Sequence, residues 1–75
     1  MMEFDESVFL KTKYNLLVPF TEISEIVPKD CDYIKFAGKW HNQNQVCYVR
    51  TSDISKNTDL RLLIALEQVG IDLFK

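Results

Sequence analysis

The chain has 75 residues, of which 47% are hydrophobic and 27% charged, with only two Gly and two Pro. This length predicts one domain over 1–75, and the composition excludes collagen-like, low-complexity and mostly disordered proteins. Nine Lys/Arg against eleven Asp/Glu give a net charge of −2, which is too balanced for a basic nucleic-acid-binding arm or an acidic DNA mimic. A chain this short hides only about 60% of its unfolded surface, so we expect it to be marginally stable unless it is stapled, metal-bound or oligomeric.

The amino terminus and the cysteines predict where the protein resides. Met1–Glu6 begins acidic and lacks the basic start of a secretory signal. The longest apolar run, Leu62–Leu66, is far shorter than the ~20 residues that cross a bilayer. Cys31 and Cys47 are too few for a disulfide framework. We therefore predict a cytoplasmic protein with reduced thiols and no membrane association.

The first regular element is expected in the amino-terminal third. Apolar residues alternate with polar ones from Val8 to Val18, which predicts one half-buried strand. The alternative is a hairpin that turns near 13–15. Pro19 is expected to end the pairing, because it has no N–H to donate.

A short helix is expected next, over Thr21–Val27. Ile23 and Ile26 have helical spacing, Thr21 is placed to cap the first turn, and Pro28 would stop the helix.

A hairpin is predicted in the middle of the chain. Cys31–Ala37 and Gln45–Thr51 are rich in β-branched and aromatic residues, and a turn region, 38–45, separates them. A turn at Lys39 would bring the two cysteines opposite each other. A turn within the Asn/Gln run would separate them.

The last element is a helix of about Leu60–Val69, with Asn57–Asp59 as capping residues and Gly70 at its end. The helix is apolar on nearly all sides, so two of its faces must be shielded from water. One face can pack on the sheet, and a second copy of the chain is the simplest partner for the other. The residues expected to self-associate are Leu62, Leu66, Val69, Ile71, Leu73 and Phe74.

Together these elements predict an α+β fold. It has a small antiparallel sheet of about three strands, a short helix after the first strand, and a C-terminal helix packed on one face.

Signatures of enzymes and metal sites are weak. The only histidine, His41, lies in a polar stretch, and no C-x-x-C pair accompanies it. Cys31 and Cys47 lie in strand patterns, where a thiol is usually a small core side chain. No glycine-rich phosphate-binding loop is present, because the only glycines are Gly38 and Gly70. We predict no catalytic residues, no metal and no cofactor.

The segment 33–52 carries the strongest functional signal. It contains three cations and no acid, together with Tyr33, Phe36, Trp40 and Tyr48. Such a surface suits a protein-binding hot spot, where Trp, Tyr and Arg are enriched. It also suits nucleic acid, whose phosphates contact cations and whose bases stack on aromatic rings. A purely structural interpretation makes the tyrosines a cross-strand pair and the lysines solubilising edge residues.

We therefore expect a small non-enzymatic regulator or inhibitor, of prokaryotic or phage type, that self-associates as a homodimer and binds and occludes an unidentified target protein. The alternative is a nucleic-acid-binding module that uses the same hairpin, 33–52. The residues expected to bind the target are Lys35, Lys39, Trp40, His41, Asn42, Gln43, Tyr48 and Arg50.

Overall fold

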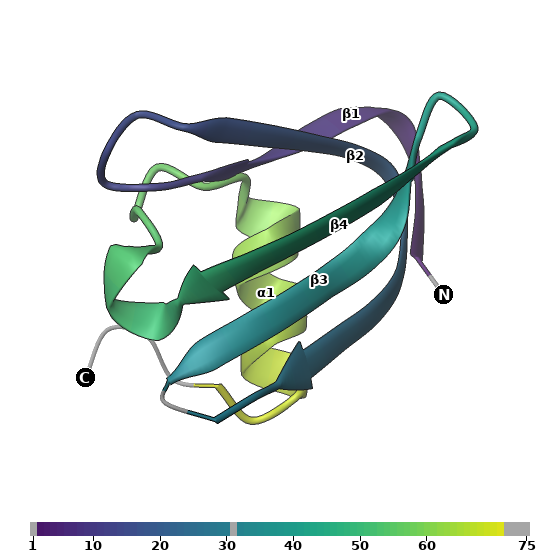
Figure 1. Ribbon diagram of the computed structural model, residues 1–75. Coiled ribbons are helices and arrows are strands. Elements are labelled where there is room, and N and C mark those ends of the chain that lie inside the picture. The colour runs from purple at the N-terminus through teal and green to yellow at the C-terminus, as the bar shows by residue number, and fades with distance from the viewer. Residues whose placement is uncertain (1, 31, 72–75) are drawn as a thin grey trace.

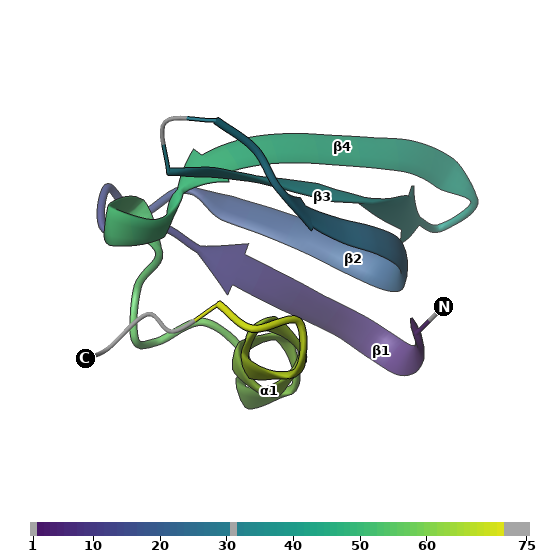
Figure 2. The same ribbon diagram turned by 90° about the horizontal axis from the view of Figure 1, so that it is seen from below.

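The computed structural model describes residues 2–30 and 32–71. It contains four strands in one antiparallel sheet of order β1-β2-β3-β4, followed by a helix (Figure 1). The elements are β1 (Met2–Lys11), β2 (Leu17–Pro28), β3 (Tyr33–Trp40), β4 (Gln43–Arg50), a 3₁₀ turn, η1 (Thr51–Asp53), and α1 (Leu60–Gln68). The helix covers one face of the sheet on its β1 side (Figure 2). The fold prediction is wrong in two respects, the number of strands and the helix after the first strand.

The predicted helix Thr21–Val27 lies within strand β2. Ile23 and Ile26 are three residues apart, so a regular strand would put them on opposite faces. The pairing of β2 with β3 is irregular between Ile23 and Glu25, and both isoleucines contact the core. The apparent helical spacing therefore comes from a bulge in a strand.

Pro19 does not end the strand pairing, contrary to the prediction from the sequence. Its carbonyl accepts a hydrogen bond of 2.9 Å from Nε2 of Gln45, so the polar backbone of this residue faces away from β1. Pairing with β3 begins only at Glu22. No neighbouring strand requires an N–H at Pro19, and the proline fits there without a lost ladder bond.

The alternating segment Val8–Val18 forms two strands rather than one. β1 ends at Lys11, and a turn centred on 13–15 leads into β2, as the hairpin alternative expected. Asn15 takes the left-handed conformation, with φ of 65°, that a glycine would have signalled. Oγ1 of Thr12 accepts hydrogen bonds from the N–H groups of Tyr14 and Leu16, which stabilises the turn.

The central hairpin is confirmed, and its turn consists of His41 and Asn42. Both residues have positive φ, 51° and 68°, which is the geometry of a type I′ turn. The turn sets Trp40 opposite Gln43 and Cys47 opposite Phe36. Cys31 lies outside the described residues.

The C-terminal helix is confirmed, and it completes a single core between itself and the sheet. Its side chains Leu62, Ala65 and Leu66 are buried. They pack with buried residues of the strands and the connecting segment, which are Val8, Leu10, Phe20, Ile23, Ile34, Phe36, Val49 and Ile54. Within residues 2–30 and 32–71, no helix is long and apolar enough to cross a membrane.

Candidate functional site

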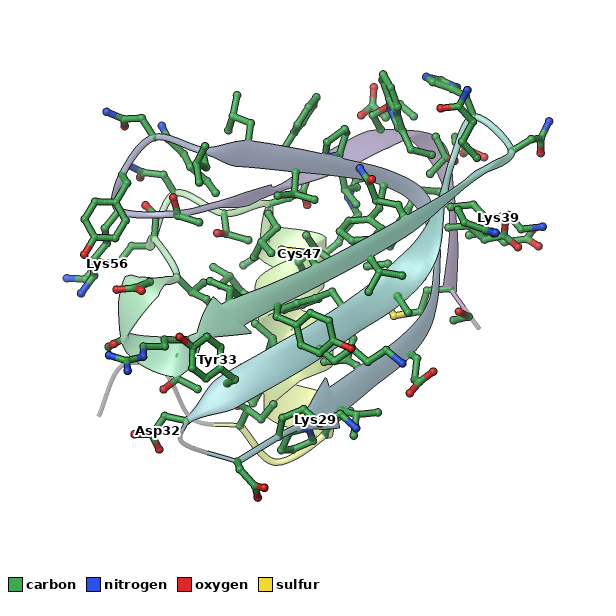
Figure 3. All side chains as sticks on the ribbon, in the orientation of Figure 1. Lys29, Asp32, Tyr33, Lys39, Cys47 and Lys56 are labelled. Carbon is green, nitrogen blue, oxygen red and sulfur yellow. The ribbon has the colours of Figure 1, made fainter. Side chains whose placement is uncertain are left out.

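In the part of the chain that the structure describes, no other segment covers the sheet face opposite α1 over β3 and β4 (Figures 1 and 3). Adjacent strands in register bring its side chains together, with Tyr33 opposite Arg50 and Lys35 opposite Tyr48. We define the hairpin face as Tyr33, Lys35, Lys39, Val46, Tyr48 and Arg50. Tyr33 and Lys39 mark its two ends (Figure 3). Its centre is apolar and accessible, because Val46 is 55% exposed and Tyr48 is 59% exposed.

Two of the three cations of the hairpin face, Lys35 and Arg50, contact other side chains of the protein. Nζ of Lys35 lies 3.6 Å from Oε1 of Glu25 on β2. The guanidinium carbon of Arg50 lies 5.3 Å from the ring centroid of Tyr33, at cation–π distance. Lys39 is in register with Glu22 of β2. The positive charge that the sequence concentrates in 33–52 is therefore partly offset by acids from the neighbouring strand.

The hairpin end is held against β1 and β2. Nε1 of Trp40 donates a 3.0 Å hydrogen bond to Oγ of Ser7, and the Trp40 ring is 37% exposed. The His41 ring lies 4.8 Å from the Trp40 ring, centroid to centroid. Oγ1 of Thr21 accepts a hydrogen bond from the backbone N–H of His41 and donates one to the Lys39 carbonyl. The end of the hairpin is thus anchored on both preceding strands.

The residues predicted to bind a target fall into two groups. Lys35, Lys39, Tyr48 and Arg50 lie on the hairpin face, and Trp40, His41, Asn42 and Gln43 form the hairpin end. The sequence interpretation missed Tyr33 and Val46 as members of the face. Alternation along 46–50 already puts Val46 with Tyr48, but the partner of Tyr33 depends on where the hairpin turns.

The residues predicted to self-associate are not all at the surface. Leu62 and Leu66 are fully buried in the core of the chain itself, and Ile71 packs against that core. Val69 is 46% exposed. The exposed side of α1 instead presents Leu60 and Ile64. Leu73 and Phe74 lie outside the described residues.

The described residues offer no obvious reactive centre. Among 2–30 and 32–71, no group of three or more His, Cys, Asp or Glu side chains lies close enough to hold a metal ion. Cys47 packs against the core, and its burial raises the pKa of the thiol because the thiolate loses hydration. His41 lies in the turn that precedes β4. Given the usual rise of a strand, Cys47 lies roughly 13 Å along β4 from the first residue of that strand.

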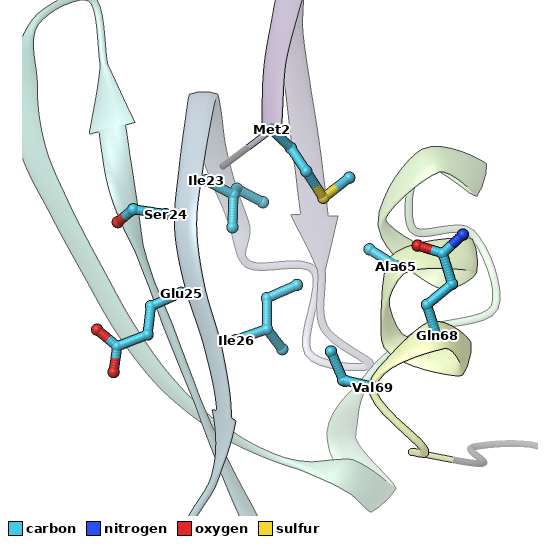
Figure 4. Close-up of a pocket in the computed structure, with 8 residues that line it drawn as sticks. All are labelled: Met2, Ile23, Ser24, Glu25, Ile26, Ala65, Gln68 and Val69. Carbon is cyan, nitrogen blue, oxygen red and sulfur yellow. The ribbon is translucent and has the colours of Figure 1, made fainter.

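A small open pocket of about 140 Å³ lies between β2 and the second half of α1 (Figure 4). Met2, Ile23, Ile26, Ala65 and Val69 give it apolar walls. The side chains of its acidic and hydroxyl members on β2 point away from the helix (Figure 4). Glu25 is the titratable residue among those that line the pocket, and its side chain points away from the helix (Figure 4).

The comparisons with known proteins identify no relative. No family model matches the chain, and neither a curated protein nor a solved structure is similar to it.

Proposed function

We propose that the protein is a small non-enzymatic regulator or inhibitor that binds a target protein through the hairpin face and occludes it. The observation that carries the proposal is the exposed centre of that face, where Val46 is 55% exposed and Tyr48 is 59% exposed. Tyrosine and arginine are enriched in the residues that dominate protein interfaces.

The distribution of charge favours a protein target over nucleic acid. A nucleic-acid site needs cations that are available to phosphates. On the hairpin face, Lys35 is paired with Glu25 and Lys39 is in register with Glu22. The acids on the same surface would repel a phosphate backbone. A protein target with an apolar centre and a mixed-charge rim fits better.

The fold explains why such a face suits occlusion. The backbone of β3 is hydrogen-bonded on both sides, and the core packs against the other face of the sheet, so the backbone loses little conformational freedom on binding. The target would be bound against the outer face of the sheet, and the 8.8 kDa chain would cover a working site by its bulk.

The test is capture of binding proteins from host cells with matched variants as bait. Tyr48→Ala should weaken binding by about 2 kcal/mol, or roughly 30-fold, because it removes the central aromatic side chain. The variant Trp40→Ala tests in the same way whether the hairpin end contacts the target. Ile64→Ala, on the exposed side of α1, is the matched control and should bind like the parent.

The outcomes separate the two functions. A captured protein that binds the parent and the control but not Tyr48→Ala supports the proposal, and a loss confined to Trp40→Ala moves the contact to the hairpin end. If both variants bind like the parent, the proposal is wrong. Binding of single-stranded DNA or RNA that falls steeply between two salt concentrations would support the nucleic-acid alternative instead.

A further inference from the structure

The two edges of the sheet are treated differently by the rest of the chain. From Phe9 onwards, the edge of β1 is hydrogen-bonded to the segment before α1. The Phe9 carbonyl accepts from the Asp59 N–H, the Lys11 carbonyl accepts from Ser55, and the Lys13 N–H donates to Asp53. This half of the β1 edge is therefore closed to another strand.

The edge of β4 has no such cover among the described residues. β4 lies at the far end of the sheet from β1 (Figure 2). Within 2–30 and 32–71, no backbone hydrogen bond joins residues 43–50 to any segment other than β3. β4 has neither proline nor lysine, and its pairing with β3 is regular throughout. Proline, lysine and bulges are the usual means of protecting an edge.

The hairpin register determines which β4 residues face this edge. The Tyr33 carbonyl accepts a hydrogen bond from Lys29 on the β2 side, whereas the Asp32 carbonyl accepts one from Thr51 on the β4 side. Even-numbered residues of β3 therefore pair with odd-numbered residues of β4. The residues of β4 that direct their N–H and C=O groups outwards are Asn44, Val46, Tyr48 and Arg50.

We infer that the β4 edge binds the β4 edge of a second copy of this chain, antiparallel and centred on Cys47. In this register Asn44 pairs with Arg50 of the second copy, and Val46 pairs with Tyr48. All four outward-facing residues then exchange hydrogen bonds. The two four-stranded sheets become one continuous sheet.

Charge and side-chain character favour a second copy as the occupant. Arg50 is the only charged residue of β4, and antiparallel pairing sets it beside a neutral Asn44. Parallel pairing would set the two Arg50 side chains together, which is unfavourable. The exposed Val46 and Tyr48 become an aromatic–β-branched cross-strand pair on each side of the two-fold axis.

This interface shares Val46, Tyr48 and Arg50 with the hairpin face, but it uses their backbone N–H and C=O groups and leaves their side chains on the side of the sheet opposite α1. The two faces would form one wider surface in the dimer. The inference does not rest on the proposed function, because its tests need no target protein.

The first test is the mass in solution. Sedimentation of the parent chain at micromolar concentration should show a dimer, twice the 8.8 kDa of the chain. Val46→Lys should raise the dimer dissociation constant roughly tenfold or more, because it adds a charge near Arg50 of the second copy. Val46→Thr is the matched control, since it keeps a β-branched side chain and adds no charge. Circular dichroism and thermal unfolding check that both variants fold.

The second test reports the register. In the predicted pairing, the two Cys47 residues face each other as a non-hydrogen-bonded pair about 4.5 Å apart between Cα atoms. This separation falls within the range of about 4.4–6.8 Å that disulfides span. In a Cys31→Ser background, diamide should take one hydrogen from each thiol and join the two sulfur atoms, and peptide mapping should find Cys47 linked to Cys47.

Each outcome decides the inference. A monomer at micromolar concentration overturns it. A dimer that Val46→Lys leaves intact but Ile64→Glu dissociates places the interface on α1 and also overturns it. A dimer sensitive to Val46→Lys that gives no Cys47 cross-link contradicts the register. A dimer that is sensitive to Val46→Lys and cross-links through Cys47 supports both edge and register.

Discussion

Gly38 shows how a single residue shapes this sheet. A Cβ atom at this position would lie 2.0 Å from the Glu22 carbonyl oxygen and 2.8 Å from the Cα of Ile23, both backbone atoms. Only glycine allows β2 to approach β3 so closely at its bulge. Gly70 differs, because its φ is +87° but no atom of the described residues lies within 4 Å of an added Cβ.

These two glycines should differ in how much stability is lost when each is replaced by alanine. Gly38→Ala should lower the free energy of unfolding by about 3 kcal/mol, because backbone must move to admit the methyl group. Gly70→Ala should cost only about 1 kcal/mol, the conformational penalty at a helix end. Urea unfolding of both variants measures the difference, and equal losses would show that Gly38 tolerates a side chain.

At the scale of elements, the helix start gives a pH-dependent prediction. Oδ1 of Asp59 accepts a 2.9 Å hydrogen bond from the backbone N–H of Arg61, and Nη2 of Arg61 lies 2.8 Å from Oδ2. Hydrogen bonding to the Arg61 side chain lowers the pKa of the Asp59 carboxyl below its unfolded value of 3.8. A carboxyl with a lowered pKa stabilises the fold above the unfolded pKa and loses that contribution as the pH falls through the folded pKa.

Asp59→Ala should therefore cost about 1 kcal/mol at neutral pH, the usual value of an N-cap. The difference between variant and parent should shrink as the pH falls below 3.8. Thermal unfolding from pH 7 to pH 2.5 measures it. A difference that stays constant over this range would mean that the charge of Asp59 contributes nothing.

The turn between β3 and β4 gives a stabilising prediction. His41 and Asn42 both occupy positive φ, where Asn-Gly is the preferred pair. His41→Asn combined with Asn42→Gly should raise the free energy of unfolding by about 1 kcal/mol, because both new residues adopt the left-handed conformation at a lower steric cost. Denaturant unfolding tests this, and a loss of stability would indicate that the contact between His41 and Trp40 outweighs the backbone preference.

At the scale of the whole molecule, the domain depends on one small core. Phe20 and Phe36 are fully buried, with ring centroids 6.4 Å apart, and they join β2 to β3 beneath the helix. Phe36→Ala should cost about 3–5 kcal/mol, a large part of the roughly 4–11 kcal/mol that a domain of this size has. Phe9→Ala, at a 42% exposed position, should cost less than half as much. Urea titration with circular dichroism compares the two, and similar losses would mean that the core is not where stability resides.

Local signals in the sequence predicted the elements whose determinants are contiguous. Asp59 caps α1 and Gly70 follows it, as the capping residues indicated, and the β-branched and aromatic residues identified both strands of the central hairpin. These features depend on residues within a few positions of one another, so the sequence contains all that is needed to recognise them.

Tertiary structure decided the features that depend on distant residues. The spacing of Ile23 and Ile26 favours a helix, whereas the pairing of this segment with β3 shows a bulge that puts both side chains in the core. The sequence pattern predicts that Leu62 and Leu66 self-associate, but packing against the sheet buries both side chains within the chain itself. Which residues lie on the hairpin face likewise depends on the position of the turn at His41 and Asn42. A shift of one residue in the strand register would move every side chain to the other face. The sequence by itself determined where strands and a helix can form. Burial against the rest of the chain decided which conformation an ambiguous segment adopts and which side chains stay at the surface, because that free energy depends on partners far away in the sequence.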